Sequence, residues 1–174
     1  MKEALGVREE ALKILARSTN ASLFIAGDFN DDLDGESHTQ GLLSFPDRDK
    51  VLESSTASTN ILFFYNVLGD LPKDKHGSYY YARRKAWNTF DTVLLAPAML
   101  RPFGEAGPDW RLPPKGKVHV ETFRYPGMVG PNGRPMTAQR TRLKDGTDKY
   151  VDGYADHFPV YVDLERVGKI KNEE

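Results

Sequence analysis

Apolar residues near the start of the chain recur at helical spacing. Between residues 3 and 17 they share one stripe, with charged residues on the other side: Ala4, Leu5, Ala11, Leu12, Ile14 and Leu15. The next apolar run, residues 22–26, does not alternate, which is typical of a strand buried on both faces. We therefore predict an amphipathic helix covering a sheet, followed by a central strand of that sheet.

Shorter elements are predicted in the middle of the chain. A short helix is expected over residues 39–43 and a turn over residues 46–49. Residues 58–68 fit either a strand or a helix. The aromatic-rich residues 78–87 and the apolar residues 89–96 are predicted to be two strands that pair as a hairpin.

The C-terminal part is dominated by loops. Residues 117–123 and 158–164 are predicted strands, separated by a long excursion over residues 126–153 that is rich in glycine and proline. Loops of that length are usually functional or mobile. No linker divides the chain, so we expect one domain over residues 1–165 and a tail over residues 166–174.

Composition limits the class of protein. A chain of 174 residues can bury a core without disulfides, and 39% hydrophobic with 28% charged residues is ordinary for a soluble protein. The longest apolar run, residues 61–65, is too short to span a membrane, and no signal peptide is visible. The chain has no cysteine, which excludes disulfides and thiolate metal sites and leaves the compartment open.

The charge is unevenly distributed although the net charge is only −1. Five carboxylates and no basic residue lie between Asp28 and Glu36, while ten Lys or Arg and five Asp or Glu lie between Arg101 and Tyr150. An acidic cluster beside a basic segment suits a metal site with a polyanionic substrate. A solvated surface with a basic loop explains the same distribution.

Asp28 and Asn30 follow the strand predicted at residues 22–26. Gly27 permits a tight turn, so both side chains can enter one crevice at the edge of a sheet. A carboxylate there can hold or deprotonate an attacking water, and an amide can donate to a phosphoryl oxygen. An Asx turn explains both residues equally well. An EF-hand loop is excluded because Gly41 stands where that loop requires a glutamate.

A second polar pair, Asp156 and His157, immediately precedes the last predicted strand. Asp156 offers an oxygen ligand for Mg²⁺ or Mn²⁺, and His157 can exchange a proton near neutral pH or stabilise phosphoryl charge. Asp91 lies in an otherwise apolar strand, where a carboxylate needs a partner such as a histidine. Ordinary surface polarity is the simpler alternative for each. Together with Asp28 these residues favour phosphoester hydrolysis.

Three ordered motifs carry a family resemblance. They are Gly27-Asp28-Phe29-Asn30, Trp87-x-x-Phe90-Asp91-x-Val93-Leu94-Leu95 and Ala155-Asp156-His157-Phe158-Pro159-Val160. In order, spacing and flanking strands they resemble the C-terminal motifs of the endonuclease/exonuclease/phosphatase superfamily, the DNase I-like group. The resemblance extends from the first helix to Glu165 and implies a layered α/β sandwich.

The resemblance also implies a role for each motif residue. Asp28 would orient or deprotonate the attacking water, or protonate the leaving group, and Asn30 would position the water and the phosphate. Asp91 would orient His157, which would hydrogen-bond a phosphoryl oxygen. Asp156, with Asp28, would help to bind Mg²⁺ or Mn²⁺.

Some features of the family have no counterpart here. Members usually have upstream strands with an Asn, the main metal-binding Glu and a further His or Tyr, whereas the first helix here begins at Met1, and Ala155 replaces the usual Ser. The chain is expected to lack much of the N-terminal sheet. A homodimer, or a missing N-terminal half, would then cover the exposed sheet. A fragment of a longer protein, a shortened dimeric protein and a divergent binding module remain open.

Substrate contacts are expected from aromatic and basic residues. Tyr81, Arg84 and Trp87 can hold phosphates or stack on bases, and Arg142 in the basic excursion can hold a polyanion. Core packing with extended arginine side chains explains the same residues. DNA, RNA, phospholipid head groups and sugar phosphates all fit. Two classes of function follow, namely a metal-dependent phosphodiesterase, nuclease or phosphatase, and a non-catalytic binding module.

Overall fold

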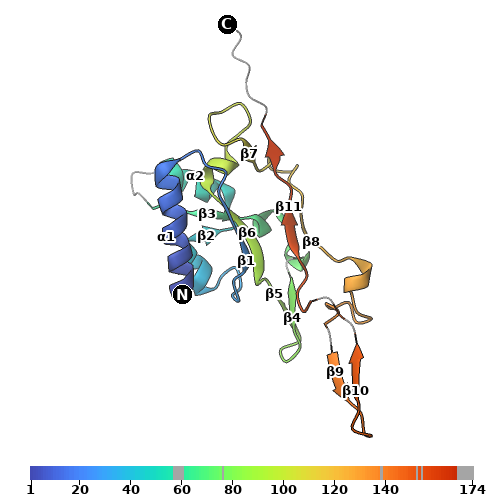
Figure 1. Ribbon diagram of the computed structural model, residues 1–174. Coiled ribbons are helices and arrows are strands. Elements are labelled where there is room, and N and C mark those ends of the chain that lie inside the picture. The colour runs from blue at the N-terminus through green and yellow to red at the C-terminus, as the bar shows by residue number, and fades with distance from the viewer. Residues whose placement is uncertain (57–60, 76, 138, 152, 154, 168–174) are drawn as a thin grey trace.

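The structure is a computed structural model that describes residues 1–56, 61–75, 77–137, 139–151, 153 and 155–167 (Figure 1). Its longer helices are α1 (Lys2–Arg17) and α2 (Arg48–Thr56). A π-helix spans Ser37–Leu42, and 3₁₀ turns span Val67–Asp70, Lys73–Lys75, Pro97–Leu100 and Pro126–Met128. The strands are β1 (Phe24–Asp28), β2 (Ser44–Phe45), β3 (Phe64–Asn66), β4 (Tyr79–Tyr81), β5 (Ala86–Asn88), β6 (Asp91–Leu95), β7 (Trp110–Arg111), β8 (Val120–Thr122), β9 (Gln139–Arg142), β10 (Asp148–Val151), β11 (Val160–Val162) and β12 (Glu165–Arg166).

A four-stranded sheet in the order β1-β6-β3-β2 forms the centre of the molecule. β6 is antiparallel to β1 and β3, and β2 is parallel to β3. Successive side chains of β6 face opposite sides, so Leu94 packs in a cluster with α1 whereas Leu95 packs in the larger core cluster on the other side. The predicted mixed α/β class is confirmed.

Helix α1 covers one face of this sheet, as predicted. It is buried through small side chains, Ala4 and Ala11, together with Leu15. The π-helix Ser37–Leu42 packs closely against α1, because a Cβ on Gly41 would lie 2.7 Å from the Cβ of Ala4. The expected stripe is wrong in part, since Leu5 and Ile14 are each 45% exposed. The helix faces the sheet with its alanines because the backbones approach closely.

The opposite face of the sheet holds the larger core cluster. Val51 of α2, Tyr65 of β3, Met99 and Val120 of β8 pack there with Leu95. The predicted turn at residues 46–49 is wrong over residues 48 and 49, because helix α2, which the sequence analysis missed, begins at Arg48. Its capping signal is Asp47, whose Oδ1 accepts bonds from the amides of Asp49 and Lys50 at 3.0 and 3.1 Å.

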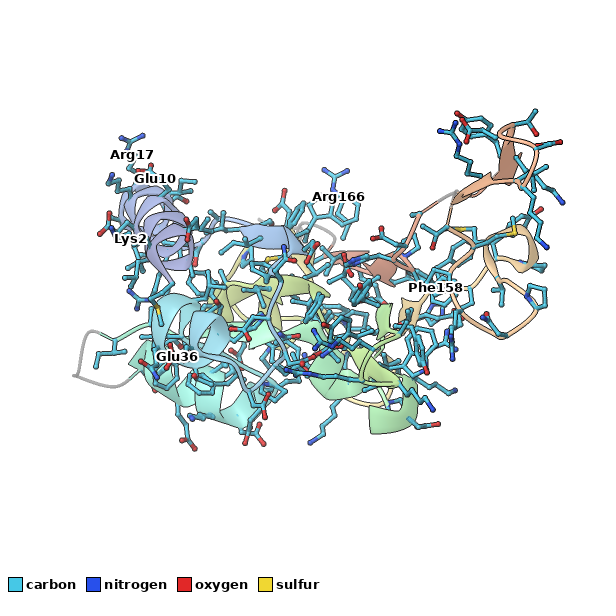
Figure 2. The ribbon with its side chains drawn as sticks, turned by 90° about the horizontal axis from the view of Figure 1, so that it is seen from below. Lys2, Glu10, Arg17, Glu36, Phe158 and Arg166 are labelled. Atoms are coloured by element: carbon cyan, nitrogen blue, oxygen red, sulfur yellow. The ribbon has the colours of Figure 1, made fainter. Side chains whose placement is uncertain are left out.

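Strands β8 and β11 pair antiparallel and confirm the two predicted strands, each in a shorter form. Val160 and Val162 of β11 pack against the larger core cluster. The preceding Phe158 is fully buried and lies where the sheets meet the segment that leads to the β9–β10 hairpin (Figure 2). The polar pair before Phe158 is thereby anchored to the core.

Strand β1 lies at the edge of the central sheet, so its predicted central position is wrong. Most of its residues are exposed, and Phe24 is 56% exposed. An apolar run without alternation does not by itself distinguish a doubly covered strand from an edge strand. The structure gives no support to the homodimer that was expected to cover the exposed sheet.

Residues 78–87 do not form one strand. The chain turns within them, so β4 and β5 pair with each other while β6 joins the central sheet. The turn contains Lys85 at φ 52°, in the left-handed region. The predicted hairpin between residues 78–87 and 89–96 is therefore wrong. The open choice for residues 58–68 resolves as β3 followed by a 3₁₀ turn, with residues 57–60 outside the described part.

The long excursion contains the β9–β10 hairpin, which projects away from the sheets (Figure 1). The predicted tail starts too early: residues 166 and 167, with Glu165 before them, bond with residues 109–111 through β12 and the Val167 amide. Among the described helices, none is long and apolar enough to cross a membrane.

Candidate active site

Three distant segments meet at one open pocket, where β1 ends and β6 begins. They are the β1 exit, the β4–β6 segment and the residues before β11. The pocket is lined by Asp28, Asn30, Tyr79, Tyr81, Arg84, Asn88, Phe90, Asp91, Asp156 and His157. The structure thus brings together most of the residues that the sequence singled out.

The sheet register places two carboxylates side by side. Asp28 is the last residue of β1 and stands directly opposite Asp91, the first residue of β6. Directly opposed residues of antiparallel strands point to the same face, and like charges there repel. Ligand atoms of Asp28, Asp91 and His157 all lie within 4.8 Å of one another. A cation or a proton at this point would relieve the repulsion.

His157 is oriented by Asp91. The imidazole Nδ1 lies 2.6 Å from Asp91 Oδ2, and both side chains are 21% exposed. An ionised carboxylate can only accept, so Nδ1 carries the proton and donates it. The other ring nitrogen, Nε2, is then the one that can act on a substrate. Tyr79 packs against the ring with centroids 4.6 Å apart.

Asn30 is held beside Asp28 by local backbone geometry. Its amide donates to Asp28 Oδ1 at 2.8 Å, and its φ of 51° is in the left-handed region. Asparagine tolerates this region better than most residues. The preceding Phe29 amide donates to the Phe90 carbonyl at 2.8 Å, which extends the β1–β6 pairing past Asp28. The Asx turn is therefore present, and it directs the Asn30 side chain to the pocket.

Ser78, which the sequence analysis did not single out, connects three segments of the site. Its hydroxyl accepts from the Asp91 amide at 3.2 Å, its carbonyl accepts from the Phe158 amide at 2.8 Å, and its own amide donates to Asn88. The side chain is fully buried. Small hydroxyl residues before a strand give no distinctive sequence signal, so this role follows from the tertiary structure.

Asp32 fixes the acidic loop to the segment before Asp91. Its carboxylate accepts from Asn88 Nδ2 and the Thr89 amide, each at 2.6 Å, and from Thr89 Oγ1 at 3.0 Å. Asp31 accepts from the Ser37 amide at 2.9 Å. These carboxylates therefore stabilise the loop, and the sequence had grouped them only as an acidic cluster.

A buried histidine lies behind the site. His38 is fully buried, its Nδ1 lies 2.8 Å from Ser44 Oγ, and its ring packs on Phe29 with centroids 5.1 Å apart. Burial lowers the pKa of His38, and the charges of Asp31 and Asp32 partly oppose this shift. The His38 ring thereby packs behind Phe29, the residue between Asp28 and Asn30.

The remaining predicted residues divide into two groups. Tyr81 and Arg84 line the pocket, and Asp156 is exposed at its rim, outside the group of three close ligand atoms. Trp87 lies outside the pocket, stacked on Phe158 at 5.9 Å with Arg124 over its ring at 4.8 Å. Arg142 lies on the projecting hairpin, paired in register with Asp148.

The donor set fits a divalent cation. Asp28 and Asp91 supply adjacent carboxylates, and Asp156 is a further oxygen donor on the same pocket. Hard cations prefer such oxygen ligands, and the repulsion between two facing carboxylates favours a bound positive charge.

Comparison with known proteins agrees with this geometry. A family model described as the endonuclease/exonuclease/phosphatase family matches residues 1–166. No curated protein and no solved structure matches the chain. The family implies phosphoester hydrolysis in general, and its members generally depend on a divalent metal. The extent of the match and the α/β layers are those of a DNase I-like fold, and the chain therefore belongs to the endonuclease/exonuclease/phosphatase family.

Proposed function

We propose that this chain is a metal-dependent phosphoester hydrolase in which water attacks phosphorus in line with the leaving group. The observation that carries the proposal is the convergence of Asp28, Asp91 and His157 within 4.8 Å on a pocket also lined by Asn30 and Asp156. Such a cluster offers a base, an imidazole and oxygen ligands at one point.

Asp28 is the proposed base or water-orienting group. One of its oxygens is occupied by the Asn30 amide, and the other remains for a water. The Asn30 side-chain amide donates to a phosphoryl oxygen and fixes the phosphate. Fixed donors in a formed pocket stabilise charge without reorganisation during the reaction.

His157 is the proposed donor to the phosphoryl group through Nε2. The bond from Nδ1 to Asp91 fixes the direction of the ring, and Nε2 donates to the phosphoryl oxygen when both ring nitrogens carry a proton. Asp91 therefore acts through His157 as a positioning residue.

Asp28 and Asp156 would hold Mg²⁺ or Mn²⁺. When bound, such an ion supplies positive charge that neutralises the equatorial phosphoryl oxygens. Tyr81 and Arg84 are the proposed substrate contacts because both line the pocket. Trp87 and Arg142, predicted as further contacts, are not part of this proposal since they lie elsewhere.

The test is hydrolysis of bis-p-nitrophenyl phosphate with Mg²⁺ or Mn²⁺. We expect Asp28→Ala and His157→Ala each to lower kcat/KM at least roughly 100-fold, the usual contribution of a general acid or base. Asp91→Asn should lower it about 10- to 100-fold because the oriented tautomer is lost. His119→Ala is the matched control, since His119 is an exposed histidine hydrogen-bonded to Asp163, which follows β11, whereas His157 precedes it.

The alternative is a binding module that kept the shape of the site. It is favoured by the position of β1, which carries Asp28 at the edge of the sheet and has mostly exposed residues. Activity that is absent with both metals, or that survives both alanine substitutions, would support this alternative and remove the hydrolase proposal.

A further inference from the structure

An open cavity of about 810 Å³, separate from the catalytic pocket, lies beside the segment that leads into β6. Most of its lining is apolar and comes from Leu33, Phe45, Pro46, Leu68, Leu71 and Trp87. Among the described residues, none lines both this apolar cavity and the catalytic pocket. A volume of this size with an apolar lining and few polar groups is typical of sites for small organic molecules.

The apolar cavity has a buried floor and a charged mouth. Leu68 is fully buried, and Leu71 and Gly77 are also buried, so these residues form the floor. The charged residues of the lining are Asp34 and Asp74, and both are exposed, which places their carboxylates at the mouth. A ligand that enters the cavity therefore passes from negative charge to apolar side chains.

The two carboxylates at the mouth are available to a cation. Neither Asp34 nor Asp74 forms an ion pair with any residue that the structure describes. Among the described residues of the lining, none is basic. Three basic residues lie near parts of the lining or of a neighbouring cavity that shares Asp74, without lining the apolar cavity themselves: Lys50, Lys75 and Arg124.

The walls of the cavity are held in place by contacts within the protein. The Leu33 amide donates to Thr89 Oγ1 at 3.2 Å, which joins two sides of the lining. Gly77 packs so closely on Trp87 that an added Cβ would lie 2.6 Å from the Cβ of Trp87. The other neighbour of Trp87 is Phe158, stacked at 5.9 Å. A cavity formed in advance needs little ordering when a ligand binds, which favours affinity.

We infer that the apolar cavity is a binding site for a small apolar molecule that carries one ammonium group. The apolar part leaves water for the floor around Leu68, which supplies the driving force. The ammonium group stays at the mouth near Asp34 and Asp74, where it keeps part of its hydration and is attracted by both carboxylates. The same carboxylates repel an anion, so this cavity does not suit a phosphoester.

The cavity and the catalytic pocket share one wall. Trp87 and Thr89 line the cavity, whereas Asn88 and Phe90 line the catalytic pocket. This alternation is expected of an extended segment, in which successive side chains point to opposite sides. A bound ammonium compound therefore contacts the segment that leads to Asp91 from the side away from the catalytic pocket, and its binding does not depend on the proposed function.

The experiment is a heteronuclear NMR titration with phenylbutylammonium chloride, beside neutral phenylbutanol and anionic phenylbutyrate as probes of matched shape. The chain has two tryptophans, of which Trp87 lines the cavity and Trp110 lies in β7. The indole signal of Trp87 should shift to saturation with a Kd on the order of 1 mM, while that of Trp110, identified with Trp110→Phe, stays in place. The ammonium compound should bind about 3-fold more tightly than the alcohol and about 10-fold more tightly than the carboxylate.

Neutral variants of the two aspartates test the source of this preference. Asp34→Asn and Asp74→Asn should each raise Kd for the ammonium compound about 2- to 5-fold, the usual range for an exposed charge pair, and leave Kd for the alcohol unchanged within about twofold. Both residues are exposed, so the melting temperature should not change. Glu36→Gln removes an exposed carboxylate of the same loop outside the cavity and is the matched control.

Several results would overturn the inference. The first is a Trp87 signal that does not shift up to about 10 mM of the ammonium compound, or shifts no more than the Trp110 signal. The second is tighter binding of the alcohol or the carboxylate, which would assign the cavity to another class of ligand. The third is binding weakened by Asp28→Asn but not by Asp34→Asn, which would place the ammonium group in the catalytic pocket. Loss of diester hydrolysis leaves this test intact, because no substrate is present.

Discussion

Removing the Asp32 carboxylate should destabilise the protein and loosen the segment before Asp91. Asp32→Ala loses three accepted bonds, two at 2.6 Å and one at 3.0 Å, from Asn88 and Thr89. A hydrogen bond to a charged acceptor contributes about 1.5–3 kcal/mol when well buried. Asp32 is only half-buried and water can replace part of these bonds, so the expected loss is about 2–3 kcal/mol in total.

The assay is thermal and urea unfolding of Asp32→Ala beside Asp34→Ala. For a domain of this size 1 kcal/mol shifts Tm by about 2–4 °C, so Tm should fall roughly 5–10 °C. Asp34 is an exposed aspartate of the same loop, and its removal should change stability by less than about 0.5 kcal/mol. Equal Tm values for the two variants would refute the reasoning, because the loss would then reflect charge in the loop rather than the bonds to Asn88 and Thr89.

Three further predictions concern buried polar groups. Ser78→Ala removes the acceptor of the Asp91 amide and should cost about 1–2 kcal/mol in urea unfolding and lower hydrolysis more than Ser22→Ala does. Burial lowers the pKa of His38 from its usual 6.5, so the unfolded chain binds the proton more tightly, and stability is complete above about pH 6.5 and falls below it. Urea unfolding at about pH 7.5 and pH 5.5 should show a smaller difference for His38→Gln, and an unchanged difference would contradict this origin. Arg111→Leu removes a buried guanidinium that donates to the carbonyls of Pro102, Glu105 and Pro108, and Tm should fall by at least roughly 6 °C with only partial recovery in Arg111→Lys.

Local sequence patterns were sufficient to predict those helices and strands that depend on the spacing of nearby residues. Helix α1 follows from helical spacing, the strand within residues 117–123 follows from alternation, and the strand within residues 158–164 follows from its apolar run. The capping aspartate of α2 was an unused local signal. The division of residues 78–87 into β4 and β5 was missed because aromatic residues favour strands wherever they occur, and the turn there is formed by charged residues rather than by glycine.

The sequence by itself named the residues that meet in the pocket, because Asp28, Asp91 and His157 stand in motifs at strand ends. Only the tertiary structure decided how they meet. The register of β1 against β6 sets the two aspartates opposite each other. Ser78, just before β4, accepts hydrogen bonds from the amides of Asp91 and Phe158, which flank the Asp91–His157 pair. It also placed Trp87 away from the pocket and Arg84 within it, since the two sides of a hairpin face different neighbours. Strand register and packing depend on contacts between distant residues, and no local pattern specifies them.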